Sequence, residues 1–172
     1  MKISAKDLTL VALFSALIAV GAFIKIPFLL VPITLQTLFV VLSALVLERR
    51  LAVLSVIVYI MIGLVGFPIF VNGGGINYIF SPTFGYLVSF IFATYFISSF
   101  KEKNIYISTA IGMLIIYALG MMYFVFIQYV LNGKVYLINY LFYNLFLVFL
   151  PGDILSCVVA IIGYRKILRL KK

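Results

Sequence analysis

Long apolar runs, separated by short clusters of charge, constrain this chain more than any other feature. Residues 8–26 contain a single charged side chain, Lys25, and similar runs recur toward the C-terminus. Hydrophobic residues make up 66% of the 172 positions, against about 45–50% in a soluble domain. A chain of this kind is expected to cross a lipid bilayer several times, at roughly 20 residues a crossing.

The predicted fold is one all-helical (all-α) transmembrane domain, residues 1–172. In lipid, only helices and closed barrels pair every backbone group, and the continuous apolar runs lack the alternation of barrel strands. The first run is long enough to span and lacks a polar cleavage region, so we interpret it as a helix rather than a signal peptide. The first five predicted spans are residues 8–26, 33–47, 51–67, 84–100 and 105–130.

The end of the chain allows two interpretations, because Pro151-Gly152-Asp153 interrupts the last apolar run. In one, residues 137–150 and 154–168 are separate crossings, which makes seven. In the other, the first piece is a short helix near the outer surface, and the sixth span begins at Pro151. The first piece would be about 21 Å long, short for a hydrocarbon core of about 30 Å. A proline also suits the first position of a helix.

The distribution of basic residues favours six crossings. With a cytoplasmic N-terminus, six spans leave 11 of the 13 lysines and arginines inside, and only Lys25 and Lys134 outside. Seven spans would place the basic C-terminal sequence RKILRLKK outside. We therefore predict a multi-pass protein of the cell membrane with both termini in the cytoplasm. The net charge of +9 follows from this pattern and does not indicate a nucleic-acid partner.

Side chains for catalysis are scarce. The chain has no histidine and one cysteine, Cys157, which we interpret as a small buried apolar residue. Asp153 lacks a second carboxylate at a comparable depth, which disfavours a membrane enzyme acting on lipid. No G-x-x-x-x-G-K-[ST] loop is present, so an ATP-driven step would need another protein. We expect no catalytic residue, no metal and no cofactor.

Three irregular stretches fall on the predicted outer side: KIPFLLVPITLQ, GGGINYIFSPTFGY and FLPGDILS. Irregular backbone at membrane depth is tolerated where protein or a wet cavity covers it. We therefore predict a small ligand cavity near the outer surface. The glycines at 73–75 suit a close backbone approach or simply a surface turn. The amino end of the span that follows Pro82-Thr83 could hold an anion.

Asp153 is the strongest single candidate for a binding residue. It is the only one of the four acidic residues that lies away from the predicted cytoplasmic interface. A charge placed at membrane depth is a functional hypothesis by default. A helix-capping aspartate exposed at the interface is the alternative. Ser156 shares its helix face, and a carboxylate beside a hydroxyl suits a ligand with N–H groups next to a carbonyl. Further polar contacts are expected from Thr34, Gln36, Asn77, Tyr86 and Tyr117.

Two small residues mark one face of the first span. Ala12 and Ala16 lie four positions apart, and such pairs let helix backbones approach closely in lipid. The contact could be internal or could involve a partner protein.

Several stretches, in order along the chain, resemble the BioY family, the biotin-binding S components of energy-coupling-factor (ECF) vitamin transporters. The matching stretches are VPITLQTLFVVLSALVL (31–47), IVYIMIGLVGFPIFVNGGG (57–75), SPTFGYLVSF (81–90), IYALGMMYF (116–124) and FLPGD (149–153).

The resemblance implies six transmembrane helices and a biotin site open to the outside. It implies assembly with a transmembrane coupling protein, which Ala12 and Ala16 would contact, and with two cytoplasmic ATPases. The family's binding Asp, loop Asn and helix-five Tyr map onto Asp153, Asn77 and Tyr117. An S component for another vitamin, or for a compound related to biotin, is the alternative.

Two positions depart from the family pattern. Family members often carry Gly where this chain has Phe84, and Lys where it has Ser156. Without that lysine, the biotin carboxylate is expected to depend on the amino end of the fourth span or to stay near water.

Overall fold

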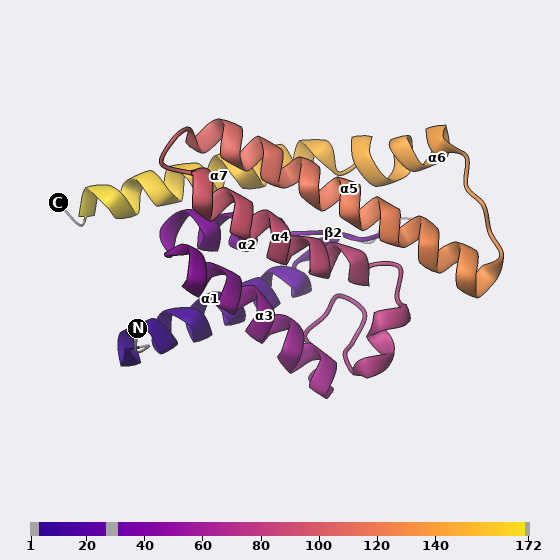
Figure 1. Ribbon diagram of the computed structural model, residues 1–172, viewed down its shortest axis with the longest axis horizontal. Helices are drawn as coiled ribbons and strands as arrows, with labels where there is room; N and C mark the ends of the chain where they lie inside the picture. Colours follow the sequence, from indigo (N-terminus) through magenta and orange to yellow (C-terminus); the bar gives the residue numbers. More distant parts are fainter. Residues whose placement is uncertain (1–3, 27–30, 171–172) are drawn as a thin grey trace.

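The computed structural model describes residues 4–26 and 31–170, which form an elongated bundle of helices (Figure 1). The elements in chain order are α1 (Ala5–Phe23), β1 (Lys25–Ile26), β2 (Ile33–Thr34), α2 (Gln36–Val46), α3 (Arg49–Val65), the 3₁₀ helix η1 (Ile76–Phe80), α4 (Phe84–Phe100), α5 (Ile105–Asn132), α6 (Ile138–Phe142), the π-helical η2 (Tyr143–Leu147) and α7 (Leu150–Leu170).

Local sequence signals set the limits of two of these helices. At the start of α1, the Ser4 hydroxyl accepts from the backbone N–H of Asp7, whose carboxylate accepts from the N–H of Ser4, a capping box. At the start of α5, the Asn104 side chain accepts from two backbone N–H groups. Gly133 ends α5 at φ 60°, a left-handed conformation that favours glycine.

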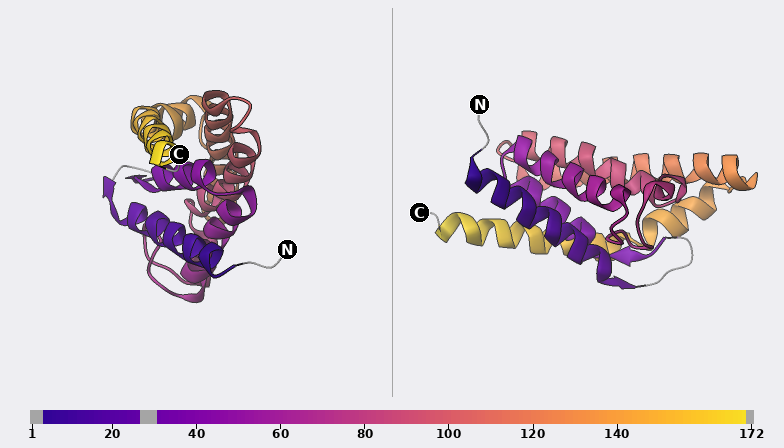
Figure 2. Two further views of the ribbon diagram at one scale, coloured as in Figure 1. Left: turned by 90° about the vertical axis from the view of Figure 1, so that its left-hand side faces the viewer. Right: turned by 90° about the horizontal axis from the view of Figure 1, so that it is seen from below.

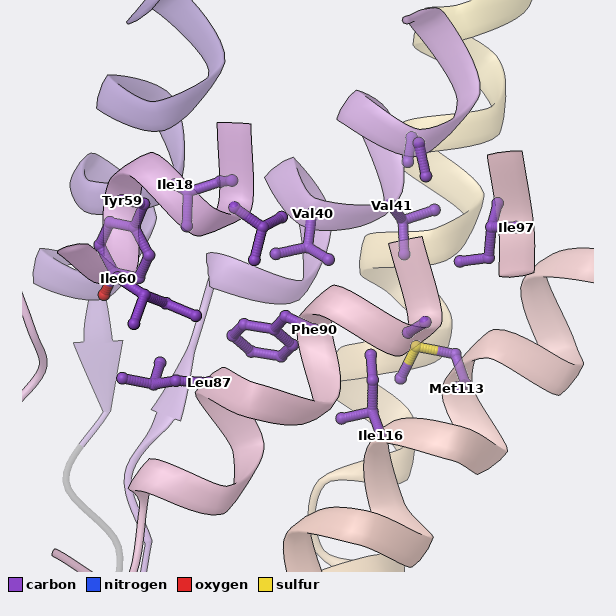
Figure 3. Packing of buried hydrophobic residues seen from close by; sticks show 14 of the residues in the cluster. Ile18, Val40, Val41, Tyr59, Ile60, Leu87, Phe90, Ile97, Met113 and Ile116 are labelled. Atoms are coloured by element: carbon purple, nitrogen blue, oxygen red, sulfur yellow. The ribbon is translucent and has the colours of Figure 1, made fainter. Parts of the chain in front are cut away.

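Helix α2 lies at the centre of the bundle, although it has only 11 residues. It contacts α1, α3, α4 and α7, and Val40 and Val41 are completely buried. Figure 3 shows these two side chains among Ile18 of α1, Phe90 of α4 and Met113 of α5, all from one apolar cluster. The other helices therefore pack around α2.

Lys101 joins the turn after α4 to the end of α2. Its Nζ donates to the carbonyl oxygens of Ala44 at 3.1 Å, Leu45 at 2.8 Å and Leu47 at 2.6 Å. The last carbonyl groups of a helix have no partner within the helix and favour a positive charge. Burial lowers the pKa of Lys101.

The first and last described residues lie at the same end of the bundle (Figures 1 and 2). We call it the basic end, because the α2–α3 turn, the α4–α5 turn and the end of α7 bring lysines and arginines there. The β1–β2 hairpin and the loops at 66–83 and 133–137 lie toward the opposite end, the loop end. Helices α1 and α5 and the stretch Asn139–Leu170 are each long and apolar enough to cross a membrane.

The bounds predicted for the first two spans were wrong where the two helices are connected. Helix α1 ends at Phe23 rather than at residue 26, and α2 begins at Gln36 rather than at 33. Between them, Lys25 pairs with Thr34 and Ile26 with Ile33 in an antiparallel hairpin. A residue that precedes a proline avoids the helical conformation, and Ile26 precedes Pro27 in the sequence.

Helix α7 begins at Leu150, one residue before the predicted start of the sixth span at Pro151. Figure 1 shows α6, η2 and α7 following one another along one direction, and Asn139–Leu170 forms a single apolar stretch of 32 residues. Pro151 lies in the first turn of α7, where a missing N–H costs little. The N–H of Asp153 bonds to the carbonyl of Phe149 across the proline at 3.0 Å. A short helix, α6, therefore precedes the long helix α7, as the second interpretation expected.

Candidate ligand-binding site

A small cavity of about 60 Å³ lies where the hairpin, α2, α4, α5 and α7 meet near the loop end. Five of the predicted binding residues line it: Thr34, Gln36, Tyr86, Tyr117 and Asp153. No lysine or arginine of the described residues lines it.

Asp153 occupies the first turn of α7 and is only partly exposed. Its Oδ2 accepts a hydrogen bond of 2.5 Å from the hydroxyl of Tyr117 on α5. The amino end of a helix favours a negative charge, so its position and its partner both stabilise the carboxylate. Its remaining lone pairs can accept N–H groups from a ligand.

Gln36 is held in place at the opposite wall by Tyr59 of α3. Its Nε2 donates to the hydroxyl of Tyr59 at 2.8 Å, and this hydroxyl donates to the carbonyl of Ile69 at 3.2 Å. Both Gln36 and Tyr59 are buried. The carboxamide oxygen of Gln36 has only a long contact of 3.5 Å, with the hydroxyl of Thr34. It therefore presents an oriented acceptor to the cavity.

Tyr86 brings a hydroxyl that has no hydrogen-bond partner among the described residues, although this atom is buried. Leaving a buried polar group unpaired costs about 1–3 kcal/mol. The hydroxyl of Thr83 lines the same cavity but is already bonded, to Tyr78 at 2.9 Å and to Ser81 at 2.8 Å. Tyr86 is thus the group that a ligand could newly satisfy.

Asn77 and Ser156 do not line the cavity. Asn77 lies in η1 with an exposed side chain. Ser156 follows Asp153 by one turn of α7 and is 4% exposed. A binding role for these two residues stays a prediction.

The glycine-rich stretch folds back onto α3 instead of lining the cavity. The N–H of Gly75 bonds to the carbonyl of Gly63 at 2.7 Å, and Gly73 and Gly75 have φ values of 117° and 99°. The close backbone approach is at Gly74, where a Cβ would lie 2.7 Å from the carbonyl carbon of Phe67. These glycines shape the loop, and its Val71 reaches the cavity.

A larger groove of about 500 Å³ runs between α5 and α7 and shares Tyr117 and Asp153 with the cavity. Most of its walls are apolar, and Leu114 and Ile162 on its rim are 57% and 61% exposed. Cys157, predicted to be a small buried residue, is partly buried along this groove. The polar groups gather at the smaller cavity, which is therefore the candidate site.

Reasoning from the sequence missed several cavity residues. Thr37, Tyr78 and Thr83 contribute polar groups, and Phe90, Ile116 and Phe149 contribute apolar walls. Thr37 directly follows Gln36, and Thr83 opens α4, so their positions gave a signal. The aromatic and aliphatic walls had none, because such residues occur throughout this chain.

The amino-acid sequence of this chain is similar to those of known proteins. Residues 1–172 match the BioY family. The chain belongs to the BioY family. Similar relatives include a probable biotin transporter BioY of Lysinibacillus sphaericus, 47% identical over 127 residues, which are 70% of this chain and 65% of the relative. The biotin transporter BioY of Thermotoga maritima is 39% identical over 173 residues, covering 97% of this chain and 96% of the relative.

A solved structure supports the same fold. The chain is similar to the S component for biotin from an ECF-type ABC transporter, with a TM-score of 0.72 and 26% identity over 95% of this chain and 91% of that one. The expected multi-pass, helical S-component architecture is therefore confirmed.

Both departures from the BioY pattern lie away from the cavity lining. Phe84 is partly buried at the start of α4, and its ring meets that of Tyr123 edge-on at 6.0 Å. Ser156 also lies outside the lining.

Proposed function

We propose that this chain is the biotin-binding membrane subunit of an ECF-type transporter and that the cavity around Asp153 is its binding site. One observation carries the proposal: in a BioY chain, the carboxylate of Asp153, bonded to Tyr117, lines a cavity together with buried amide and hydroxyl groups. The ureido ring of biotin offers two N–H donors flanking a carbonyl, which this set of acceptors and donors complements.

Each polar group has a separate task in this proposal. Asp153 and the carboxamide oxygen of Gln36 accept N–H groups, and the unpaired Tyr86 hydroxyl donates to the ureido carbonyl. Apolar walls such as Phe90 and Phe149 cover the remaining ring. The cavity measures only about 60 Å³, so we infer that the 66–83 loop moves outward before biotin enters.

Transport requires partners. A single transmembrane domain with six crossings and cytoplasmic termini would place the basic end inside and the cavity outside. Ala12 and Ala16 have exposed side chains on α1, open to a transmembrane coupling protein. Two cytoplasmic ATPases would supply the energy, and this chain itself performs no catalysis.

Titration of the purified full-length protein with biotin tests the proposal, with thiamine and riboflavin as alternative vitamins. We expect saturable binding of biotin and no binding of thiamine or riboflavin. Asp153→Asn places an amide N–H where the ureido N–H must bind, and is expected to weaken affinity about 10- to 100-fold. Glu102→Gln is the matched control, since Glu102 is exposed at the basic end.

Undiminished affinity in Asp153→Asn would remove Asp153 from the site. Binding of another vitamin in preference to biotin would favour the alternative S component.

A further inference from the structure

The polar groups at the cavity account for the uncharged ring of biotin but not for its carboxylate. No cation of the described residues lines the cavity. Two lysines belong to the segments at the loop end, Lys25 in β1 and Lys134 after α5. A carboxylate that stays partly wet still gains from a nearby cation.

Lys25 reaches the rim of the cavity. Its Nζ donates a hydrogen bond of 2.5 Å to the carbonyl oxygen of Val71, and Val71 lines the cavity. Lys25 also pairs directly with Thr34 across the hairpin. Residues opposite one another in an antiparallel pair project from the same face, and Thr34 lines the cavity as well.

The bond to Val71 uses one of the three protons of the ammonium group. The hydrogen bonds of the described residues give Lys25 no acidic partner, and three of the four acidic residues, Asp7, Glu48 and Glu102, lie in segments at the basic end. Two donors of the Lys25 ammonium group are therefore available to an anion at the mouth of the cavity.

We propose that Lys25 is a specificity-determining residue that binds the carboxylate of the ligand at the mouth of the cavity, while Asp153 holds the ring at its inner end. This inference rests on the proposed biotin function. The site then has two distinct ends. The inner end accepts N–H groups, and the mouth of the cavity provides a cation for the carboxylate chain. Such a site selects a free acid over its neutral ester or amide.

The test compares biotin with biotin methyl ester, which keeps the ring and removes the charge. Both compounds are titrated into the unchanged protein, Lys25→Gln, Lys25→Arg and Lys134→Gln. We expect Lys25→Gln to weaken biotin about fivefold, the size of an exposed ionic contact, and to leave the ester unchanged. Lys25→Arg keeps the preference for the acid, and so does Lys134→Gln, the matched control at the same end of the bundle.

The assignment is overturned if Lys25→Gln weakens acid and ester equally, which would mean that the lysine only holds the hairpin against Val71. It is also overturned if the variant changes neither affinity, which would leave the amino end of α4 as the anion contact. Failure of the unchanged protein to bind either compound would instead remove the biotin function itself.

Discussion

Tyr117 and Asp153 connect α5 to α7 through a hydrogen bond of 2.5 Å at the edge of the cavity. The tyrosine hydroxyl donates to this carboxylate, and the side chain of Thr37 on α2 forms a further hydrogen bond with it. Removing the tyrosine hydroxyl with Tyr117→Phe leaves the acid less stabilised and freer to rotate. We expect biotin affinity to fall about fivefold, less than in Asp153→Asn, as measured by calorimetric titration.

Tyr129→Phe is the control for this change, because Tyr129 lies on the same helix and is 62% exposed. It should bind biotin like the unchanged protein. An affinity of Tyr117→Phe equal to that of its control would mean that the bond does not orient Asp153 for the ligand.

Tyr59 supports the cavity from behind and is fully buried. In Tyr59→Phe, Gln36 loses the acceptor of its Nε2 group, and the carbonyl of Ile69 loses its donor. One buried and one part-buried polar group then lose these partners, and we expect a loss of about 1–3 kcal/mol in the free energy of unfolding. Unfolding by denaturant in detergent measures this loss, with the exposed Tyr143→Phe as control. Equal stability of the two variants would contradict the role assigned to Tyr59.

The helical core of the fold could be predicted from the sequence because hydropathy responds directly to the bilayer. Predicted spans at 84–100 and 105–130 agree closely with α4 and α5. The hairpin could not be predicted, because the β1–β2 pairing depends on two short strands separated in sequence. The start of α7 beside Pro151 could be predicted, because a proline suits the first turn of a helix.

Some residues of the candidate site could also be predicted from the sequence, and others could not. Asp153 and Gln36 could be predicted because burying a polar group within an apolar segment is costly, and such groups therefore often have a functional role. The supporting role of Tyr59 could not, because one tyrosine among 12 has no distinguishing sequence signal. Asn77 was expected in the site from its polar side chain and from the resemblance, and its side chain is exposed in η1. Only the packing of the 66–83 loop determines which of its residues reach the cavity.

Gly74 should tolerate no side chain. A Cβ there would collide with the carbonyl oxygen of Phe67 and lie 3.0 Å from that of Gly63. Backbone atoms cannot move aside as a flexible side chain can, so Gly74→Ala is expected to displace the loop. We expect a loss of about 1–3 kcal/mol in the free energy of unfolding, which lowers the melting temperature by several degrees.

Gly163→Ala is the matched control for this substitution. Its Cβ would meet only Leu42 Cδ1 at 3.6 Å, and alanine favours a helix by about 1 kcal/mol over glycine. Thermal unfolding should therefore rank the control at or above the unchanged protein. A Gly74→Ala variant as stable as that control would show that the loop does not depend on this contact.

The exposed face of α1 gives the prediction that separates binding from transport. Ala12 and Ala16 are exposed, so Ala12→Leu and Ala16→Leu add volume without disturbing the described core. We expect biotin affinity and thermal stability to stay unchanged, because the cavity lies elsewhere. Uptake by cells that also produce the coupling protein and ATPases should fall about tenfold or more, since larger side chains keep helix backbones apart.

Ala110→Leu provides the comparison, because Ala110 is an exposed alanine on α5. Its uptake should remain normal if the partner meets α1 alone. Normal uptake in both α1 variants would place the coupling contact on another surface of the bundle. Lost binding in either variant would show instead that this face of α1 stabilises the binding site.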